Sequence, residues 1–287
     1  AAHVWPGRTP EIGPLSDAGI SFFKSFTCTT HGVPGLEHSQ RSAALEAIAR
    51  TGARCLIHNE DEQLTREAEQ RLKELGRTDP GLLLEWRTRE AELTATAGTA
   101  AAVLDSGVAA TFAHVSSVEV LDVIDAFRRR GADIATETCP QYLGLDEDEV
   151  IEQGALRKFT PPARIRDESE RAAMWEAVAG DRFSHISTDH APSTVAQKLS
   201  GDFWSAPFGL PGLDTTLPFL LDAALRGRIG LAELVKLYAT APAARYRLPK
   251  GVLAPGADAD LVLIDPTGSW TVRDEDIISK AGWSPFR

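Results

Sequence analysis

The sequence predicts an α/β fold in which helices pack on a mostly parallel sheet, of the kind that can close into an α/β barrel. Short apolar runs suited to buried strands alternate with longer amphipathic stretches, and this rhythm is typical of consecutive βα units. The length of 287 residues, with 43% hydrophobic content, is sufficient for one large core, and α/β barrels often occupy this length.

The predicted strands are short apolar segments, listed here in chain order: Ile20 to Phe26, Arg54 to His58, Ala110 to Val115, Asp133 to Thr138 and Phe183 to Thr188. The predicted helices have apolar residues at helical spacing. They cover Ser39 to Thr51, Glu60 to Leu75, Thr88 to Ser106, Ser117 to Arg130, Glu168 to Gly180, Thr215 to Leu225 and Leu231 to Tyr246.

Turn and cap residues support these boundaries. Several predicted helices are followed by a glycine where a left-handed cap is favoured, namely Gly52, Gly107, Gly131 and Gly180. The acidic run that begins at Asp146 predicts an exposed helix start. Near the C-terminus, the segment GVLAPGADADLVLIDP predicts two strands around a tight turn, which belong to a small β domain and not to the barrel.

Composition excludes several classes of function. The net charge of -11 and the pI of about 5.2 argue against nucleic acid or an anionic membrane as a partner, and favour a small-molecule substrate. Cys28, Cys55 and Cys139 are far apart and form no CxxC pair, so we expect neither a disulfide framework nor a thiolate zinc site. A membrane-spanning run and a signal peptide are absent from this sequence, and we expect a cytoplasmic protein.

Polar residues occur where the predicted strands end. Because alternate residues of a strand face the same side, Lys24, His58 and His114 can each point into a barrel interior. Asp189 follows the last predicted strand, and α/β barrels place their chemistry at this C-terminal end. Each residue alone has a simpler explanation, as a hydrogen-bonded core histidine or a capping aspartate. Together, the four residues predict a common site.

These side chains suit a metal centre. A buried, unpaired ammonium is costly, so Lys24 must extend to solvent, pair with an anion or be modified, and carbon dioxide converts a neutral amine into an anionic carbamate. The imidazoles of His58 and His114 are typical zinc ligands, and Asp189 offers a hard oxygen ligand or a proton acceptor. We expect one or two divalent ions, with zinc favoured by ligand type and manganese or iron open.

The chain resembles the cyclic amidohydrolase branch of the amidohydrolase superfamily, which contains dihydroorotases, allantoinases and hydantoinases or dihydropyrimidinases. The resemblance rests on motifs in the family's order, namely GISFFKSF, LIHNED, AHVSSVEVLDVI, ETCPQYL, FTPPAR, STDHAP, APFGLPGLDTTLP and GADADLVLIDP. It implies a distorted TIM (β/α)8-type barrel with a small β-sandwich domain. It also implies that Lys24 is a carboxylated bridging ligand, that His58 and His114 bind metal, and that Asp189 is both ligand and catalytic proton shuttle.

One departure concerns the His-x-His pair that the family carries on its first strand, which has no counterpart in this sequence. The resemblance then implies that residues 1–248 contain strands three to eight of the barrel, and that residues 249–287 are a partial β-sandwich domain. The chain also begins without methionine, and we expect it to be truncated, to hold at most one metal well and to be a poor catalyst. Uncovered strand edges favour a homo-oligomer.

Two positions bear on which cyclic amide is the substrate. Thr29 stands where hydantoinases and dihydropyrimidinases usually carry a tyrosine, as it does in some allantoinases, and this weakens the hydantoinase interpretation. Ser193 stands where dihydroorotases usually carry a histidine that helps to bind the substrate carboxylate. This weakens the dihydroorotase interpretation, although APFGLPGLDTTLP is most similar to that group.

Other polar residues have alternative roles. Thr160 takes a place from which family members contact the ring amide through backbone groups. Arg164 either binds an anion or supports its loop, and His190 either contacts substrate or holds the loop of Asp189. We expect Tyr142 to be a packing aromatic and His185 to be a core histidine.

The sequence therefore predicts hydrolysis of a cyclic amide C–N bond by metal-activated hydroxide. The alternative is a catalytically impaired or non-catalytic homologue that acts as a scaffold or binding protein. The presence of Lys24, His58, His114 and Asp189 together favours the enzyme, because a scaffold has no reason to direct these groups at one point.

Overall fold

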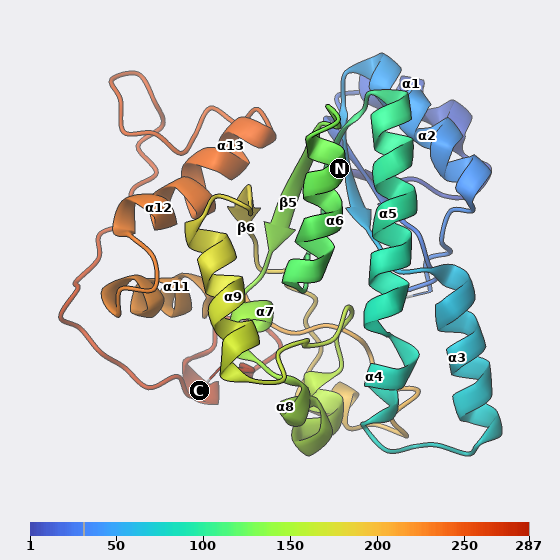
Figure 1. Cartoon of the computed structure of the whole chain (residues 1–287). Helices are drawn as coiled ribbons and strands as arrows, with labels where there is room; N and C mark the ends of the chain where they lie inside the picture. The colour runs from blue at the N-terminus through green and yellow to red at the C-terminus, as the bar shows by residue number, and fades with distance from the viewer. Residues whose placement is uncertain (31, 287) are drawn as a thin grey trace. The chain divides into compact units, whose positions relative to one another are not determined.

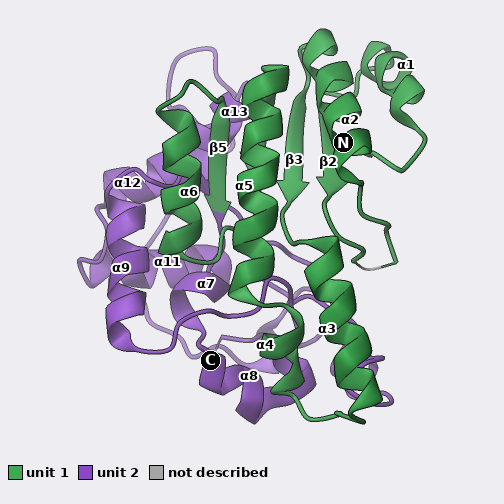
Figure 2. Cartoon of the chain, turned by 45° about the vertical axis from the view of Figure 1, so that its right-hand side comes forward, with its two compact units in different colours: residues 1–137 green, residues 138–287 purple. Residues whose placement is uncertain are grey.

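The structure, a computed structural model, describes residues 1–30 and 32–286. The chain forms two compact units, Ala1–Glu137 and Thr138–Arg287, which Figure 2 draws in green and purple. None of the helices in the described ranges combines the length and apolar character that a membrane crossing requires.

The first unit is built on a parallel sheet whose strand order follows the chain (Figure 1). Its strands are β1 (Ala2–His3), β2 (Phe22–Phe26), β3 (Arg54–His58), β4 (Ala109–Phe112) and β5 (Ile134–Thr138). The predicted strand at 54–58 is confirmed at both ends. Strands β2 and β5 begin two residues and one residue later than predicted, and β4 covers 109–112 instead of 110–115. The strand predicted at 183–188 forms only at 185–186.

The register of β2 against β3 fixes which side chains share a face. Lys24 lies opposite Leu56, and Phe26 lies opposite His58. Alternate residues point to the other face, where Phe23, Cys55 and Ile57 are completely buried. The polar ends of β2 and β3 therefore lie on one face, as the sequence predicted.

The helices of the first unit are α1 (Ile12–Asp17), α2 (His38–Thr51), α3 (Glu62–Glu74), α4 (Leu82–Trp86), α5 (Arg89–Ser106) and α6 (Val118–Arg128), with a 3-10 turn at Thr9–Glu11. Helix α5 packs against α2 and against α6, and α2 also packs on β3. Gly52 and Gly107 adopt φ values of 71° and 68° at the ends of α2 and α5, which are the predicted left-handed caps.

The second unit is mostly helical. Its helices are α7 (Gln141–Gly144), α8 (Glu147–Gln153), α9 (Glu168–Ala179), α10 (Val195–Lys198), α11 (Thr216–Leu225), α12 (Leu231–Val235) and α13 (Ala241–Arg245), with 3-10 turns at Gly154–Arg157 and Asp274–Asp276. Strand β6 (His185–Ile186) precedes Ser187, whose backbone N–H donates to Thr138 O at 3.0 Å. Asp146 caps the N-terminus of α8, as the acidic run predicted.

Two local predictions for this unit need correction. Gly180 follows α9 with φ of -91°, and the left-handed residue is instead Asp181, with φ of 59°. The single helix predicted at 231–246 forms as α12, a π-helical turn at Lys236–Thr240 and α13. Pro242 has no backbone N–H to continue the regular hydrogen-bond ladder, which accounts for a break at this place.

The predicted strand pair at 251–266 is also wrong for the described residues, because no strand forms between residues 249 and 286. A strand needs a neighbouring strand to satisfy its backbone groups, and this segment pairs with none of the strands in the described part of the chain. Its apolar side chains are largely exposed, with Leu263 at 100% and Leu253 at 88%. The division of the chain at residue 248 stays a prediction.

Two buried lysines hold a loop of the second unit through backbone carbonyls. Lys198 Nζ donates to Lys158 O and Pro207 O, both at 2.8 Å. Lys158 Nζ donates to Phe203 O at 2.7 Å and Ala206 O at 2.6 Å. Burial, together with the positive charge of Lys158, lowers the pKa of Lys198 from 10.5 to about 7.

This pKa predicts a pH-dependent contribution to stability. Between pH 7 and pH 10.5 the unfolded chain binds a proton at Lys198 that the folded chain lacks, so the free energy of unfolding should increase as the pH rises through this window. We expect the difference in unfolding free energy between the native protein and Lys198→Met to grow from pH 7 to pH 9, by at most about 1.4 kcal/mol per pH unit.

Urea unfolding at both pH values measures this difference. Lys280→Met makes the same change at an exposed position of the same unit and should give no such pH dependence. A difference for Lys198→Met that does not change with pH would contradict the prediction.

Candidate metal centre

The predicted ligands of the first unit come from neighbouring strands. Lys24 lies within β2, His58 ends β3, and His114 follows β4 by two residues. Parallel strands that are adjacent in a sheet end at the same edge, and this topology places the three residues near one another. Lys24 is half-buried, with Nζ 5.0 Å from the centroid of the Phe26 ring, and that ring lies 5.4 Å from the His58 ring.

The two histidines face each other through ring nitrogens. His58 Nδ1 lies 2.9 Å from His114 Nε2, and the ring planes are inclined at 69°. Both side chains are buried, with 2% and 4% exposed. Two imidazole nitrogens this close can serve one ion, because zinc binds histidine nitrogen at about 2.0–2.1 Å. The donor set therefore fits a divalent metal.

His114 reaches this position through an unusual backbone conformation. Its φ is 41°, a left-handed value that costs a residue other than glycine about 1–3 kcal/mol. Hydrogen bonds on both sides hold it there: Ala113 N–H donates to Ile57 O at 3.0 Å, and Val115 N–H donates to Glu137 O at 2.7 Å. The turn directs the ring of His114 to His58, beyond the last paired residue of β4.

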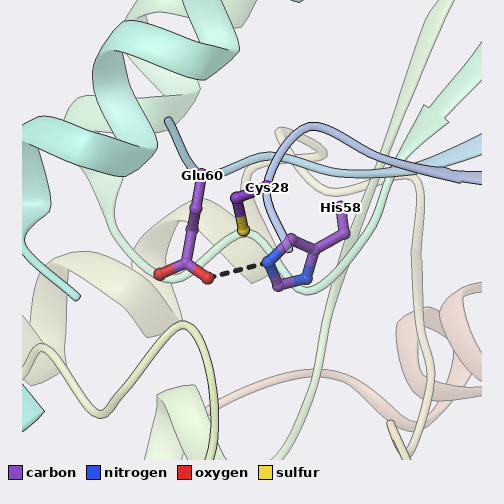
Figure 3. A group of neighbouring side chains, drawn as sticks. All are labelled: Cys28, His58 and Glu60. Atoms are coloured by element: carbon purple, nitrogen blue, oxygen red, sulfur yellow. Dashed lines mark hydrogen bonds and ion pairs between the residues drawn. The ribbon is translucent and has the colours of Figure 1, made fainter. Parts of the chain in front are cut away.

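A buried carboxylate contacts the opposite nitrogen of His58 (Figure 3). His58 Nε2 lies 2.7 Å from Glu60 Oε2, and the Glu60 side chain is completely buried. Arg87 Nη1 donates to the same carboxylate oxygen at 3.3 Å and to Cys28 Sγ at 3.1 Å. Sequence reasoning missed Glu60 and Arg87, although the spacing of Glu60 from His58 in LIHNED was a usable signal.

Burial determines the protonation state of this cluster. It lowers the pKa of His58, against the opposing influence of the Glu60 carboxylate, while the charges of Lys24 and Arg87 lower it further. Burial also raises the pKa of the Cys28 thiol to about 12. A neutral imidazole is the form that binds metal, whereas a protonated thiol is a poor ligand.

Among the described residues, Cys28, His58 and Glu60 also place one ligand atom each within 4.8 Å of one another. The guanidinium of Arg87 contacts both Cys28 and Glu60 and already neutralises the carboxylate. A cation among these three groups would face that guanidinium at close range. These groups therefore occupy the Nε2 side of the His58 ring, and the Nδ1 side, which faces His114, is the side that fits a cation.

The remaining predicted site residues belong to the second unit. Asp189 follows β6 and, like His114, has a left-handed φ, of 44°. His190 Nδ1 accepts hydrogen bonds from the N–H groups of Gly212 at 3.0 Å and Leu213 at 3.2 Å, which is the loop-holding role. Thr160 and Arg164 are buried, with 5% and 3% exposed. The convergence of Asp189 with the first-unit ligands stays a prediction.

Two aromatic predictions are confirmed by the packing of the second unit. Tyr142 is completely buried, packs edge-on against Phe159, and donates its hydroxyl to Pro161 O at 2.9 Å. His185 is buried and packs edge-on against Tyr246, with ring centroids 5.9 Å apart. Both residues are part of the core.

Parallel βα units with a lysine within one strand, and histidines at or just after the ends of the next two, define an α/β architecture with a candidate metal centre. The Amidohydrolase family pattern matches residues 21–281, and the chain belongs to this family. Members of the family typically bind divalent metals.

Comparison with curated proteins finds two enzyme names among similar sequences. The chain is 32% identical to an allantoinase of Solibacter usitatus (strain Ellin6076) over 99% of its own length and 62% of the relative's. It is 33% identical to an allantoinase of Rubrobacter xylanophilus, over 99% and 63%. It is also 32% identical to a dihydroorotase of Halobacterium salinarum, over 98% and 64%. The chain thus spans less than two thirds of the length of these relatives.

Solved structures confirm the fold class. L-hydantoinase (dihydropyrimidinase) from Arthrobacter aurescens superposes with a TM-score of 0.92 at 26% identity, over 99% of this chain and 64% of that one. Dihydropyrimidinase from Brevibacillus agri NCHU1002 gives the same TM-score and identity. The α/β fold of the TIM-barrel type that the sequence predicted is the fold of this chain.

The buried thiols of the protein should be unreactive. Cys28, Cys55 and Cys139 are buried thiols, and the pKa of Cys28 is raised to about 12. We expect native protein at pH 8 to react very slowly with a chromogenic disulfide reagent, and denatured protein to release three equivalents at once. Rapid reaction of one native thiol that disappears in Cys28→Ala would contradict the buried position of Cys28 behind His58.

Proposed function

We propose that this chain carries the metal site of a cyclic amide hydrolase, with His58 and His114 as nitrogen ligands, Lys24 as a carboxylated ligand and Asp189 as ligand and proton shuttle. The observation that carries the proposal is the pair of facing imidazole nitrogens at adjacent strand ends, 2.9 Å apart, in a chain of the Amidohydrolase family. Zinc is the proposed metal, because imidazole nitrogen is among its preferred ligands.

The ligand side chains divide the work of binding. The neutral imidazoles of His58 and His114 donate lone pairs, and a carbamate on Lys24 adds negative charge where an unmodified ammonium would repel a cation. A divalent ion held here supplies Lewis acidity, which lowers the pKa of water and polarises an amide carbonyl. Lys24 lies on the same face of the sheet as Phe26 and His58, and this position supports its role as a ligand.

The protein groups then handle protons and substrate. The Asp189 carboxylate accepts a proton from the attacking water and returns it to the ring nitrogen as the C–N bond breaks. We infer that backbone groups of Thr160 hold the ring amide, while His190 keeps the loop after Asp189 in place through Gly212 and Leu213. Arg164 is a candidate for an anionic substituent of the substrate.

The substrate is a cyclic amide, and a ureide ring such as allantoin is the first one to test. Thr29 does not offer a phenol to a scissile carbonyl, and its hydroxyl already donates to Glu62 Oε1 at 3.0 Å. This disfavours the hydantoinase interpretation. Two allantoinases and a dihydroorotase have 32–33% identity to this chain, and these names support the choice of substrates.

Metal binding tests the ligand assignment. We expect His58→Ala and His114→Ala each to lower zinc affinity by more than about 100-fold, because loss of a ligand should exceed the 10- to 100-fold effect of an outer partner. Competition with a chromophoric chelator measures the affinity. His38→Ala, which removes an exposed histidine, should leave it unchanged. Equal zinc affinity in all three variants would refute the assignment.

Hydrolysis tests the catalytic assignment. The zinc-loaded protein is incubated with allantoin, dihydroorotate and a hydantoin, and ring opening is followed by chromatography. We expect Asp189→Asn to lower kcat by about 100-fold or more, because positioned proton transfer contributes about 10²–10⁴-fold. Zinc binding without hydrolysis of any of the three would support the alternative, a binding or scaffold protein.

A further inference from the structure

We propose that Glu60 and Arg87 form a positioning pair that fixes the tautomer and direction of His58 before any metal binds. This inference rests on the proposed role of His58 as a ligand. The pair does not contact the metal position itself. It acts on the opposite side of the ring, where Glu60 Oε2 lies 2.7 Å from His58 Nε2 (Figure 3).

The tautomer follows from the contacts of Glu60 Oε2. This oxygen accepts a hydrogen bond from Arg87 Nη1 at 3.3 Å and lies 2.7 Å from His58 Nε2, so it is placed to accept a second one from that ring nitrogen. The His58 proton must then reside on Nε2, and Nδ1 keeps its lone pair directed at His114 Nε2. A histidine that binds metal through one nitrogen usually donates the other N–H in this way, which orients the ring and increases its basicity.

The backbone of Glu60 is held in place by hydrogen bonds to Thr27. Glu60 N–H donates to Thr27 Oγ1 at 2.9 Å, and the Thr27 hydroxyl donates to Glu60 O at 2.7 Å and contacts His58 O at 3.0 Å. The next residue, Asp61, donates its N–H to Ala91 O at 2.9 Å. The segment 58–61 is thereby tied to the strand end that follows Lys24 and to helix α5.

Arg87 connects the loops that follow two ligand-bearing strands. It stands at the end of α4, with its guanidinium 4.7 Å from the centroid of the Trp86 ring, and its side chain is only 3% exposed. Its Nη2 donates to Thr29 O at 3.2 Å, and Nη1 donates to Glu60 and Cys28. One guanidinium thus binds the loop after β2 and the loop after β3.

The burial of Glu60 and Arg87 has a free-energy cost that calls for an explanation. Burying a carboxylate and a guanidinium has a large desolvation penalty, which their attraction repays only with good geometry and further hydrogen bonds. An apolar pair would fill the same volume without that penalty. The retained charges are explained by what Glu60 does to His58, because an apolar side chain cannot accept the Nε2 proton.

The test is a substitution that keeps shape and removes the charge. We expect Glu60→Gln to lower zinc affinity by about 10- to 100-fold, the range typical of outer partners of a metal-bound histidine. Glu62→Gln is the matched control, because Glu62 lies two residues away and its carboxylate binds Thr29. It should leave the affinity within about twofold of the native value.

A second readout needs no metal. In metal-free native protein, the ¹⁵N resonances of the histidine side chains should show His58 as a single Nε2–H tautomer, and in Glu60→Gln they should show mixed tautomers. His58→Ala assigns the resonance. If Glu60→Gln does not fold, Arg87→Lys replaces it, since a lysine keeps the charge but cannot reach Glu60, Cys28 and Thr29 together. The same two readouts then apply, with a smaller loss of affinity.

The outcomes separate this inference from the proposed function. Unchanged affinity and an unchanged tautomer in the folded Glu60→Gln protein would overturn the positioning role, while a large effect of His58→Ala would keep the metal site. If His58→Ala has no effect on zinc binding, the proposed metal site fails, and a tautomer change in Glu60→Gln still supports the positioning role.

Discussion

The burial of His58 between two polar partners is the constraint on which the rest of the candidate site depends. An imidazole with 2% exposure must satisfy both ring nitrogens inside the protein, and here one faces Glu60 while the other faces His114. Glu60 then requires Arg87, because an isolated buried carboxylate would be protonated and would lose its role as acceptor. The position of Glu60 thus follows from the hydrogen-bond requirement of His58, and the position of Arg87 follows from the charge of Glu60.

Much of the fold follows from local sequence patterns. Alternation placed Lys24 and His58 on one strand face, and the strand at 54–58 was predicted to the residue, because both features depend only on the period of a strand. The caps at Gly52 and Gly107 are equally local. The segment at 251–266 has the composition of strands, but a strand also needs a partner, and composition contains no information about one.

Glu60 and Arg87, which hold His58 in place, were harder to predict from the sequence. Arg87 is 27 residues from Glu60 and 59 from Cys28 along the chain, so nothing in its local pattern indicates their contact. Arg87 also directly follows α4, a short helix that the periodicity did not predict. Glu60 lies in the motif LIHNED, yet the helical spacing of apolar residues placed it at the start of a predicted helix, Glu60 to Leu75. The structure shows that helix beginning at Glu62, with Asp61 as its cap.

Each of the two units contains at least one residue other than glycine with a left-handed backbone conformation. Outside glycine, the described residues with left-handed φ are His114, Asp181, Asp189 and Arg247. Two of these, His114 and Asp189, are predicted ligands, and they lie two and three residues after the ends of β4 and β6. A tight left-handed turn redirects a side chain at the point where the strand stops pairing, and the cost is met by the flanking hydrogen bonds.

At His114 those bonds come from Ala113 and Val115, and at Asp189 from His190 N–H to Thr188 Oγ1 and Ala191 N–H to Leu210 O. A protein with no use for the direction of these side chains would relax the turns or place glycine in them. The strained backbone of His114 and Asp189 is therefore best explained by the directions it gives to their side chains. This favours a ligand-binding role over a scaffold role for the two residues, which the strand pattern alone could only place at the edge of the sheet.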